Sequence, residues 1–147
     1  MLETVNQIKN AAIRFLSQRE HSQKELLRKL QQKGHEHEDC LGVLSELVEL
    51  GLQSEQRFAE MIVRTRQQKQ YGELRIRAEL AEHHLSEGII STALEENPAD
   101  YFQLCADVLN KKYPDGAAKD FQAKMKQKRY LSTRGFTMEQ IAYALGE

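Results

Sequence analysis

Apolar residues recur along almost the whole chain at the three- and four-residue spacing of amphipathic helices. No stretch alternates polar and apolar residues as a half-buried strand would. Breaks in the helical pattern predict nine helices, which form three groups of three at residues 1–53, 54–97 and 98–147. The sequence therefore predicts an all-α protein built from three tandem three-helix repeats.

Polar residues at the predicted helix starts support this division. Ser22 and Thr137 each precede a helix, and each is followed three positions later by Glu25 or Gln140, the pattern of a capping box. Asn97–Pro98 predicts the start of the seventh helix, because Asn caps helices and Pro suits the first helical position.

Equivalent apolar positions recur in the three groups. A shift of about 50 residues relates the first group to the second, and a similar shift relates the second to the third. The aligned triplets are Leu30, Leu80 and Leu131; Cys40, Ile90 and Ile141; and Leu44, Leu94 and Leu145. Any helical protein gives some matches, but several at nearly one offset favour true repetition. In the third group, the pattern also places Phe102 and Phe121 on buried helix faces.

Composition indicates the cellular compartment in which we expect the protein. Charged residues make up 29% of the chain, and the two cysteines, Cys40 and Cys105, sit in apolar-periodic stretches. Such cysteines are typical of buried thiols in a reducing compartment. The first residues lack the apolar core of a signal peptide, and no run approaches the roughly 18 apolar residues of a membrane span. We expect a cytoplasmic monomer with no membrane segment.

Charge is distributed in alternating blocks. The net charge is +5 over residues 9–33, −6 over 34–60, +4 over 61–78, −7 over 79–107 and +6 over 108–135. If the repeats stack in one direction, the blocks form a basic stripe beside an acidic one. A basic stripe attracts phosphates, and an acidic stripe can meet a basic protein surface. The plainer alternative is a set of solvated helices whose charges neutralise one another.

The basic blocks supply the candidate binding residues. We predict that twelve side chains contact DNA or a nucleoprotein filament: Arg64, Arg66, Lys69, Tyr71, Arg75, Arg77, Lys111, Lys112, Lys124, Lys128, Arg129 and Arg134. Tyr71 stands at a break between two helices, flanked by cations. Its ring either packs across that junction, with its hydroxyl in water, or stacks on an unpaired base.

Residues that would indicate an enzyme do not form a recognisable set. His35–Cys40 superficially resembles a metal cluster, but Cys40 falls on the apolar helix face and no second ligand pair has metal spacing. The sequence contains no glycine-rich phosphate loop, and neither cysteine has a matching histidine and acid. We predict no catalytic residue, no metal site and no cofactor.

The same central residues resemble the signature of a known family. The matching residues are Leu50-Gly51-Leu52, Arg57-Phe58-Ala59, Arg64, Tyr71-Gly72 and Leu74-Arg75-Ile76, with His21–Leu26 before them and Leu131, Arg134-Gly135-Phe136 and Ile141 after them. This pattern resembles the RecX family, bacterial modulators of the RecA recombinase. The chain departs from it at Gln53–Glu55, where the family has an acidic pair, and at His83–His84, where it has a small or glycine-containing helix end.

The resemblance implies a fold and a function. It implies an elongated, curved array of three-helix repeats that binds RecA nucleoprotein filaments, within the helical groove. It also implies inhibition of strand exchange, ATP hydrolysis and the repressor cleavage of the SOS response, with some affinity for single- or double-stranded DNA. The residues by themselves leave two alternatives open: a sequence-independent DNA-binding repeat protein that competes for single strands, and a scaffold that binds only proteins.

Overall fold

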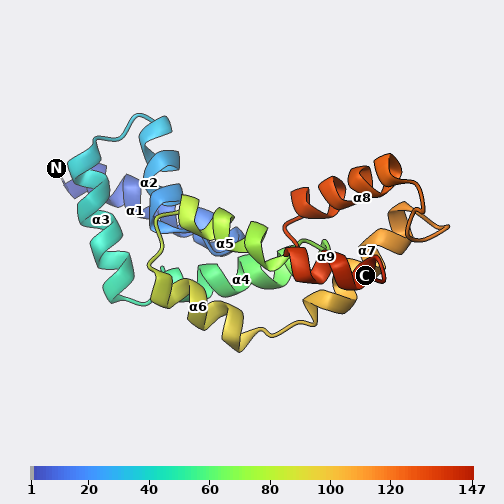
Figure 1. Cartoon of the computed structure of the whole chain (residues 1–147). Coiled ribbons are helices and arrows are strands. Elements are labelled where there is room, and N and C mark those ends of the chain that lie inside the picture. Colours follow the sequence, from blue (N-terminus) through green and yellow to red (C-terminus); the bar gives the residue numbers. More distant parts are fainter. Residues whose placement is uncertain (1) are drawn as a thin grey trace. The chain divides into compact units, whose positions relative to one another are not determined.

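The computed structural model describes residues 2–147, and helices are the only regular elements in that range. The nine helices are α1 (Leu2–Gln18), α2 (Gln23–Gln32), α3 (His37–Glu49), α4 (Glu55–Gln68), α5 (Glu73–Glu82), α6 (Glu87–Glu96), α7 (Tyr101–Lys112), α8 (Phe121–Thr133) and α9 (Met138–Ala144) (Figure 1). The predicted all-α class and helix number are therefore confirmed for these residues. The elongated, curved shape stays a prediction.

Burial follows the predicted repeat. All nine residues of the three aligned triplets are buried, with at most 8% of any one exposed. Equivalent positions in the three groups are therefore buried alike.

The helices divide between two compact units. Unit 1 comprises the residues up to Met61 together with Ala81–Ala93, and unit 2 comprises Ile62–Leu80 together with Leu94–Glu147. Helices α4, α5 and α6 thus contribute residues to both units. The predicted boundaries at residues 53 and 97 stay predictions.

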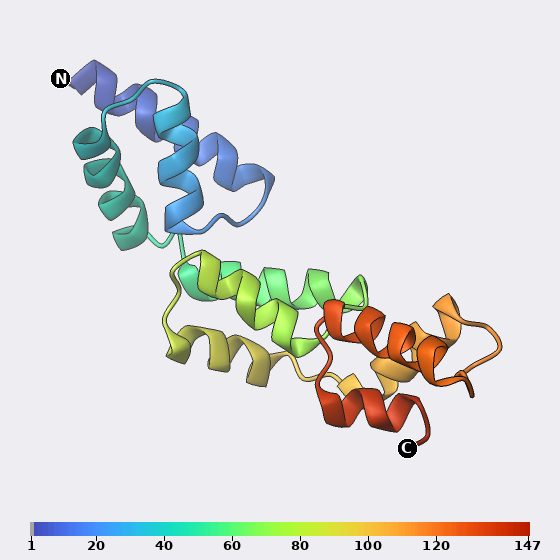
Figure 2. The same cartoon turned by 45° about the horizontal axis from the view of Figure 1, so that its top comes forward.

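Unit 1 is centred on α1, α2 and α3, which lie side by side (Figure 2). Its core consists of Ile8, Ala11, Ala12, Leu30, Cys40, Val43 and Leu47. Ser22 caps α2 as predicted, because its hydroxyl accepts a hydrogen bond from the Glu25 amide. The reciprocal half of that capping box was wrongly predicted, since the Glu25 carboxylate binds Arg19 instead.

A buried histidine completes the turn between α1 and α2. His21 is 1% exposed, and its Nδ1–H donates to the Arg19 carbonyl at 3.0 Å. Its Nε2 lies 2.9 Å from the Lys29 ammonium, which only donates, so the ring is neutral. Burial lowers the pKa of His21, and the nearby Lys29 charge acts in the same direction.

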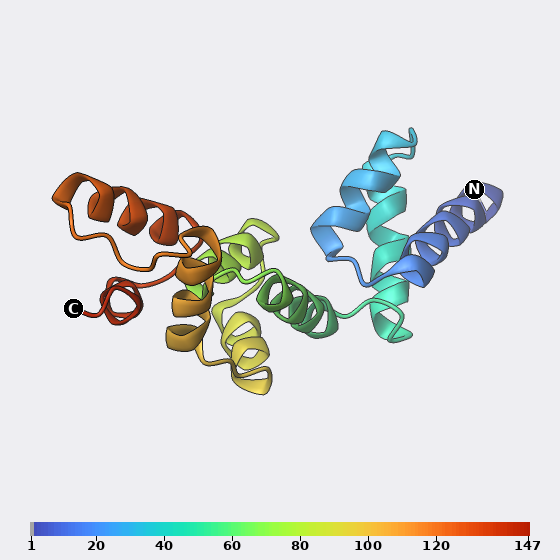
Figure 3. The ribbon, with the colours of Figure 1, turned by 90° about the vertical axis from the view of Figure 1, so that its right-hand side faces the viewer.

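Unit 2 is centred on α7, α8 and α9, which pack against one another (Figure 3). Its core consists of Cys105, Val108, Leu109, Leu131, Phe136, Ile141 and Leu145. Thr137 and Gln140 form the predicted capping box at the start of α9.

Three predictions for this half of the chain were wrong. Helix α7 begins at Tyr101 rather than at Asn97–Pro98, because Asp100 is the residue whose carboxylate caps the first turn. Phe102 is 41% exposed, since it lies at the edge of the face that Cys105 and Leu109 bury. Phe121 is 75% exposed, because it is the first residue of α8 and precedes the part of that helix that packs.

Two backbone hydrogen bonds tie separate helix junctions together within unit 2. The Gly72 amide, just before α5, donates to the Arg134 carbonyl at 2.8 Å, and the Leu74 amide donates to the Gly135 carbonyl at 3.0 Å. A Cβ on Gly72 would overlap the Gly135 carbonyl, and a Cβ on Gly135 would overlap Arg75. Gly135 also has a φ of 99°, which L side chains rarely adopt. Only glycine permits this approach at both positions.

We expect Gly72→Ala to destabilise unit 2 selectively, by roughly 1–3 kcal/mol, because backbone atoms must move to admit the methyl group. Each unit carries one fully buried cysteine, Cys40 or Cys105, and burial raises the pKa of Cys105 to about 12. Thiol labelling should therefore report the opening of each unit separately. The variant should label faster at Cys105, with little change at Cys40.

The matched control is Gly42→Ala, an exposed glycine within α3 where an added Cβ meets nothing within 4 Å. It should stabilise the chain by roughly 0.5–1 kcal/mol, because alanine favours a helix interior. An unchanged labelling rate of Cys105 in Gly72→Ala would contradict the close backbone approach of Gly72 and Gly135.

The neutral His21 predicts a pH dependence. As pH falls below 6.5, the unfolded chain binds a proton that folded His21 resists, so the free energy of unfolding decreases until the lowered folded pKa is reached. His21→Gln keeps a donor and an acceptor but does not titrate. Urea unfolding at pH 7.5 and pH 5.5 should show a smaller loss of stability for this variant, and equal losses in both proteins would contradict the assignment.

Candidate nucleic-acid interface

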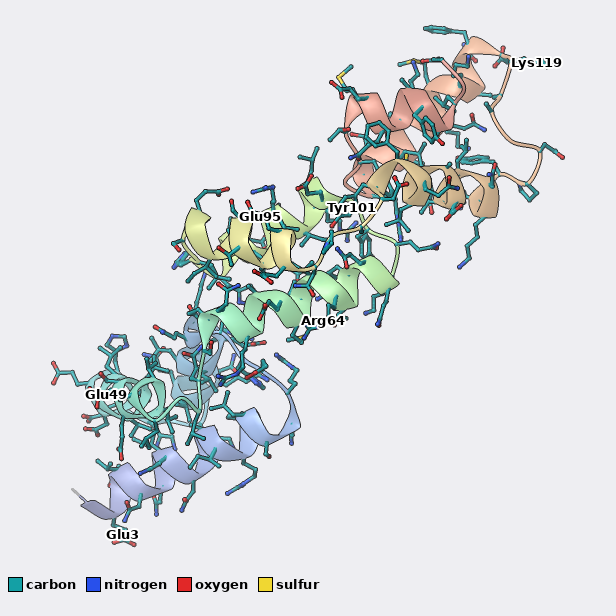
Figure 4. All side chains as sticks on the ribbon, turned by 90° about the horizontal axis from the view of Figure 1, so that it is seen from below. Glu3, Glu49, Arg64, Glu95, Tyr101 and Lys119 are labelled. Carbon is teal, nitrogen blue, oxygen red and sulfur yellow. The ribbon has the colours of Figure 1, made fainter. Side chains whose placement is uncertain are left out.

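All twelve predicted contact residues belong to unit 2, on α4, α5, α7, α8 and the adjoining turns. Arg64 lies on α4, where its guanidinium donates to the side-chain oxygen of Asn97 at 3.4 Å; Figure 4 labels Arg64 on its helix. The residues differ in what they already bind within the chain, and eight of the twelve fall into two sets.

Four of the predicted cations form ion pairs. Arg66 makes a two-pronged contact with Glu79, with both distances 2.7 Å, and this hydrogen bonding raises the pKa of Arg66. Arg77 pairs with Glu73 at 3.5 Å, one turn earlier on α5. Lys124 and Lys128 approach the two carboxylate oxygens of Glu147 at 3.4 and 3.3 Å, and their hydrogen bonds lower the pKa of that carboxyl. A nucleic acid would have to compete with these carboxylates.

A second set of cations surrounds one cleft. Lys69, Lys111, Lys112 and Arg134 line a cleft of about 410 Å³, together with Gln70, Val108 and Tyr130. The described residues around it include no carboxylate. The Lys112 ammonium also lies over the Tyr130 ring, 5.3 Å from its centroid, which is within the roughly 6 Å of a cation–π contact. The cleft therefore offers several positive groups to one anion.

The cations stand where three helices end. Lys69 and Gln70 follow α4, Lys111 and Lys112 are the last residues of α7, and Arg134 follows α8. Helix C-termini carry partial negative charge, so part of this positive charge serves to stabilise the helices themselves. Arg134 does so directly, because its guanidinium donates to the carbonyls of Lys69 and Gln70 at 2.5 and 3.1 Å.

Tyr71 lies beside the cleft and is covered by arginines. The guanidinium carbons of Arg75 and Arg134 each lie over its ring, 4.1 Å from the centroid. Arg75 also donates to the Thr133 carbonyl at 3.3 Å. This arrangement supports the packing interpretation of Tyr71, since an unpaired base would have to displace a guanidinium before it could stack.

Six of the twelve residues therefore lie in or beside the cleft: Lys69, Tyr71, Arg75, Lys111, Lys112 and Arg134. Arg129 is an exposed residue of α8, and it forms no ion pair among the described side chains. Sequence reasoning missed Gln70 and Tyr130 as cleft residues. The sequence could have indicated Tyr130, because this aromatic residue directly follows the cations Lys128 and Arg129. Gln70 has none, since its left-handed φ of 64° appears only in the structure.

Residues that suggest other chemistry have structural explanations. The Ser22 hydroxyl lies 2.7 Å from His83 Nδ1, but Ser22 is fully buried and also accepts the Glu25 amide as a helix cap. It cannot reach a substrate. No group of three or more metal-ligating side chains occurs within the described part of the chain, and none of its helices is both long and apolar enough to cross a membrane.

Comparison with known proteins decides the family. Three family models match successive parts of the chain: the first three-helix domain of RecX at residues 9–47, the second at 54–94 and the third at 99–145. The chain belongs to the RecX family. This confirms the resemblance seen in the sequence, and it assigns three helices of the fold to each matched segment.

Curated RecX relatives match along nearly their whole length. The chain is 39% identical over 137 residues to the regulatory protein RecX of Vibrio campbellii, covering 93% of this chain and 88% of the relative. It is 37% identical over 145 residues to that of Pseudomonas fluorescens, covering 99% and 94%. The crystal structure of RecX from Lactobacillus salivarius superposes with a TM-score of 0.78 at 22% identity, covering 99% and 97%. That structural similarity supports the fold.

The arginine contacts of Tyr71 predict different results for two substitutions. Tyr71→Phe keeps the ring and should change the free energy of unfolding by less than about 0.5 kcal/mol. Tyr71→Leu removes both cation–π contacts and should lose roughly 1–2 kcal/mol. Urea unfolding of both variants checks this. Equal stability of the two variants would show that the cation–π contacts of Tyr71 do not contribute to the free energy of unfolding.

Proposed function

We propose that this RecX-family chain binds RecA nucleoprotein filaments and inhibits RecA's recombinase, ATPase and co-protease activities without catalysing a reaction itself. Its curated relatives are named regulatory proteins, which supports a regulatory role. In this proposal RecA and DNA are both partners, no cofactor takes part, and the cytoplasm is where the chain meets them.

The observation that carries the DNA part of the proposal is the cationic cleft of unit 2. Lys69, Lys111 and Lys112 are exposed, and the described residues lining the cleft contribute no negative charge. Ammonium groups bind phosphates as point charges, so they favour the nucleic-acid backbone over any particular base. A phosphate of the filament's DNA is the ligand that this chemistry suits best.

A second candidate function rests on the same cleft. Because phosphate contacts do not depend on sequence, a chain with this cleft could also act by competing for single-stranded DNA alone. Excess DNA would then relieve inhibition, and an unrelated single-strand binder would be displaced as readily as RecA.

The function is tested by adding the chain to RecA on single-stranded DNA and measuring ATP hydrolysis. We expect hydrolysis to slow when the chain is present in amounts similar to RecA or below. No effect at any ratio would contradict the proposal. Equal displacement of an unrelated single-strand binder from the same labelled oligonucleotide would favour the competing function.

The cleft predicts which cations matter for DNA. Lys69→Gln with Lys111→Gln should weaken binding to a single-stranded oligonucleotide and reduce the salt slope by about 1.4, because each phosphate contact contributes roughly 0.7. The matched control is Lys124→Gln with Lys128→Gln, which removes the same charge from lysines that Glu147 already pairs. The control should change the slope by less than half as much, and equal changes would indicate that only total charge matters.

A further inference from the structure

A second cavity of unit 2 lies at the loop of residues 113–120, which joins α7 to α8 (Figure 1). Its volume is about 440 Å³, close to that of the cationic cleft. We call this cavity the loop pocket. Cavities of this size with a partly apolar lining are typical of sites that hold a small organic group. The apolar part of the lining comes from Tyr113, Pro114, Ala117, Ala118 and Ala123.

A buried glutamine braces the loop pocket. Gln127 of α8 is 4% exposed, and its side-chain amide donates to the Gly116 carbonyl at 3.0 Å. Its side-chain oxygen accepts a hydrogen bond from the Ala118 amide at 2.9 Å. The Gly116 amide in turn donates to the Tyr113 carbonyl at 2.8 Å. The loop is therefore fixed on both sides of Ala117, and a pocket wall that is already fixed reduces the entropy lost when a ligand binds.

The loop pocket adjoins the cationic cleft. Lys112 lines both cavities. Tyr113 of the pocket and Tyr130 of the cleft meet edge to face, with ring centroids 6.1 Å apart and planes at 83°. These two rings and Lys112 therefore stand where the cavities meet. A ligand whose anionic group occupies the cleft can place the next part of the same molecule in the loop pocket.

The charges at the loop pocket suit a nucleotide. Lys112 and Lys126 contribute two ammonium groups, and Asp115 is the one carboxylate among the described lining residues. All three side chains are exposed. The excess of positive charge attracts phosphates, and a carboxylate can accept a hydrogen bond from an amino group of a base. A nucleotide combines the anion that the cleft suits with a flat ring that can stack on Tyr113.

We infer that the loop pocket holds an unpaired base of single-stranded DNA whose phosphate lies in the cationic cleft. This inference rests on the DNA part of the proposed function. A base in a duplex is paired and stacked, so it would have to leave the double helix before it entered the pocket. The loop pocket therefore gives the chain a preference for single strands that phosphate contacts alone do not provide.

Oligonucleotides with and without bases test this inference. We expect the unaltered chain to bind an oligothymidylate at least fivefold more tightly than an abasic oligomer of the same length and charge, because stacking of one base on an aromatic ring is worth about that factor or more. Ala123→Leu places a larger side chain in the pocket lining and should bring the two affinities within twofold of each other. Its affinity for the abasic oligomer should stay within twofold of the unaltered chain's, because the cleft is unchanged.

A second variant and a matched control accompany the first. Ala117→Leu narrows the pocket from the loop and should also remove the preference for bases. The control is Gln122→Leu, which adds the same side chain at an exposed position of α8 that does not line the pocket. It should leave both affinities within twofold of the unaltered chain's. Circular dichroism verifies that each variant is folded.

Three results would overturn the inference. The first is equal binding of the two oligomers by the unaltered chain, and the second is an unchanged preference for bases in both pocket variants. The third is a preference that is absent while both pocket variants still weaken inhibition of RecA's ATPase, because the occupant would then be a protein segment. A chain that binds neither oligomer would instead overturn the proposed DNA contact at the cationic cleft, together with this inference.

Discussion

The close approach of two glycines is the constraint on which unit 2 depends. Gly72 and Gly135 let the junction before α5 reach the junction after α8, where backbone groups bond directly. The same approach brings Arg75 and Arg134 onto the Tyr71 ring and directs Arg134 to the carbonyls at the end of α4. Since Arg134 also lines the cationic cleft, the contact that holds these helices together also positions the charge that we propose for DNA binding.

The surface of unit 2 carries two chemically different regions. Cations collect where α4, α7 and α8 end, while α9 and the first part of α7 carry carboxylates and exposed aromatic rings. Long-range attraction of phosphates and short-range burial of apolar groups are different physical effects, and each would be weakened by mixing the two surfaces.

Much of the fold could be predicted from the sequence because helical periodicity and its breaks are local. The nine helices, the caps at Ser22 and Thr137, and the burial of the repeated triplets follow from such signals. The start of α7 could not, since Asn97–Pro98 and Asp100 are both good starts and tertiary packing decides between them. Predicted site residues were chosen by charge alone, so the sequence could not separate Lys111, at the cleft, from Lys128, which pairs with Glu147.

Native-state hydrogen exchange of the Gly72 and Leu74 amides tests the junction most directly. Both amides donate to carbonyls of the opposite junction rather than within a helix. If that contact holds unit 2 together, they should exchange only when the unit unfolds, with the same opening free energy as core amides of α8 such as that of Leu131. Exchange through a local opening several kcal/mol easier than that of the Leu131 amide would contradict the account.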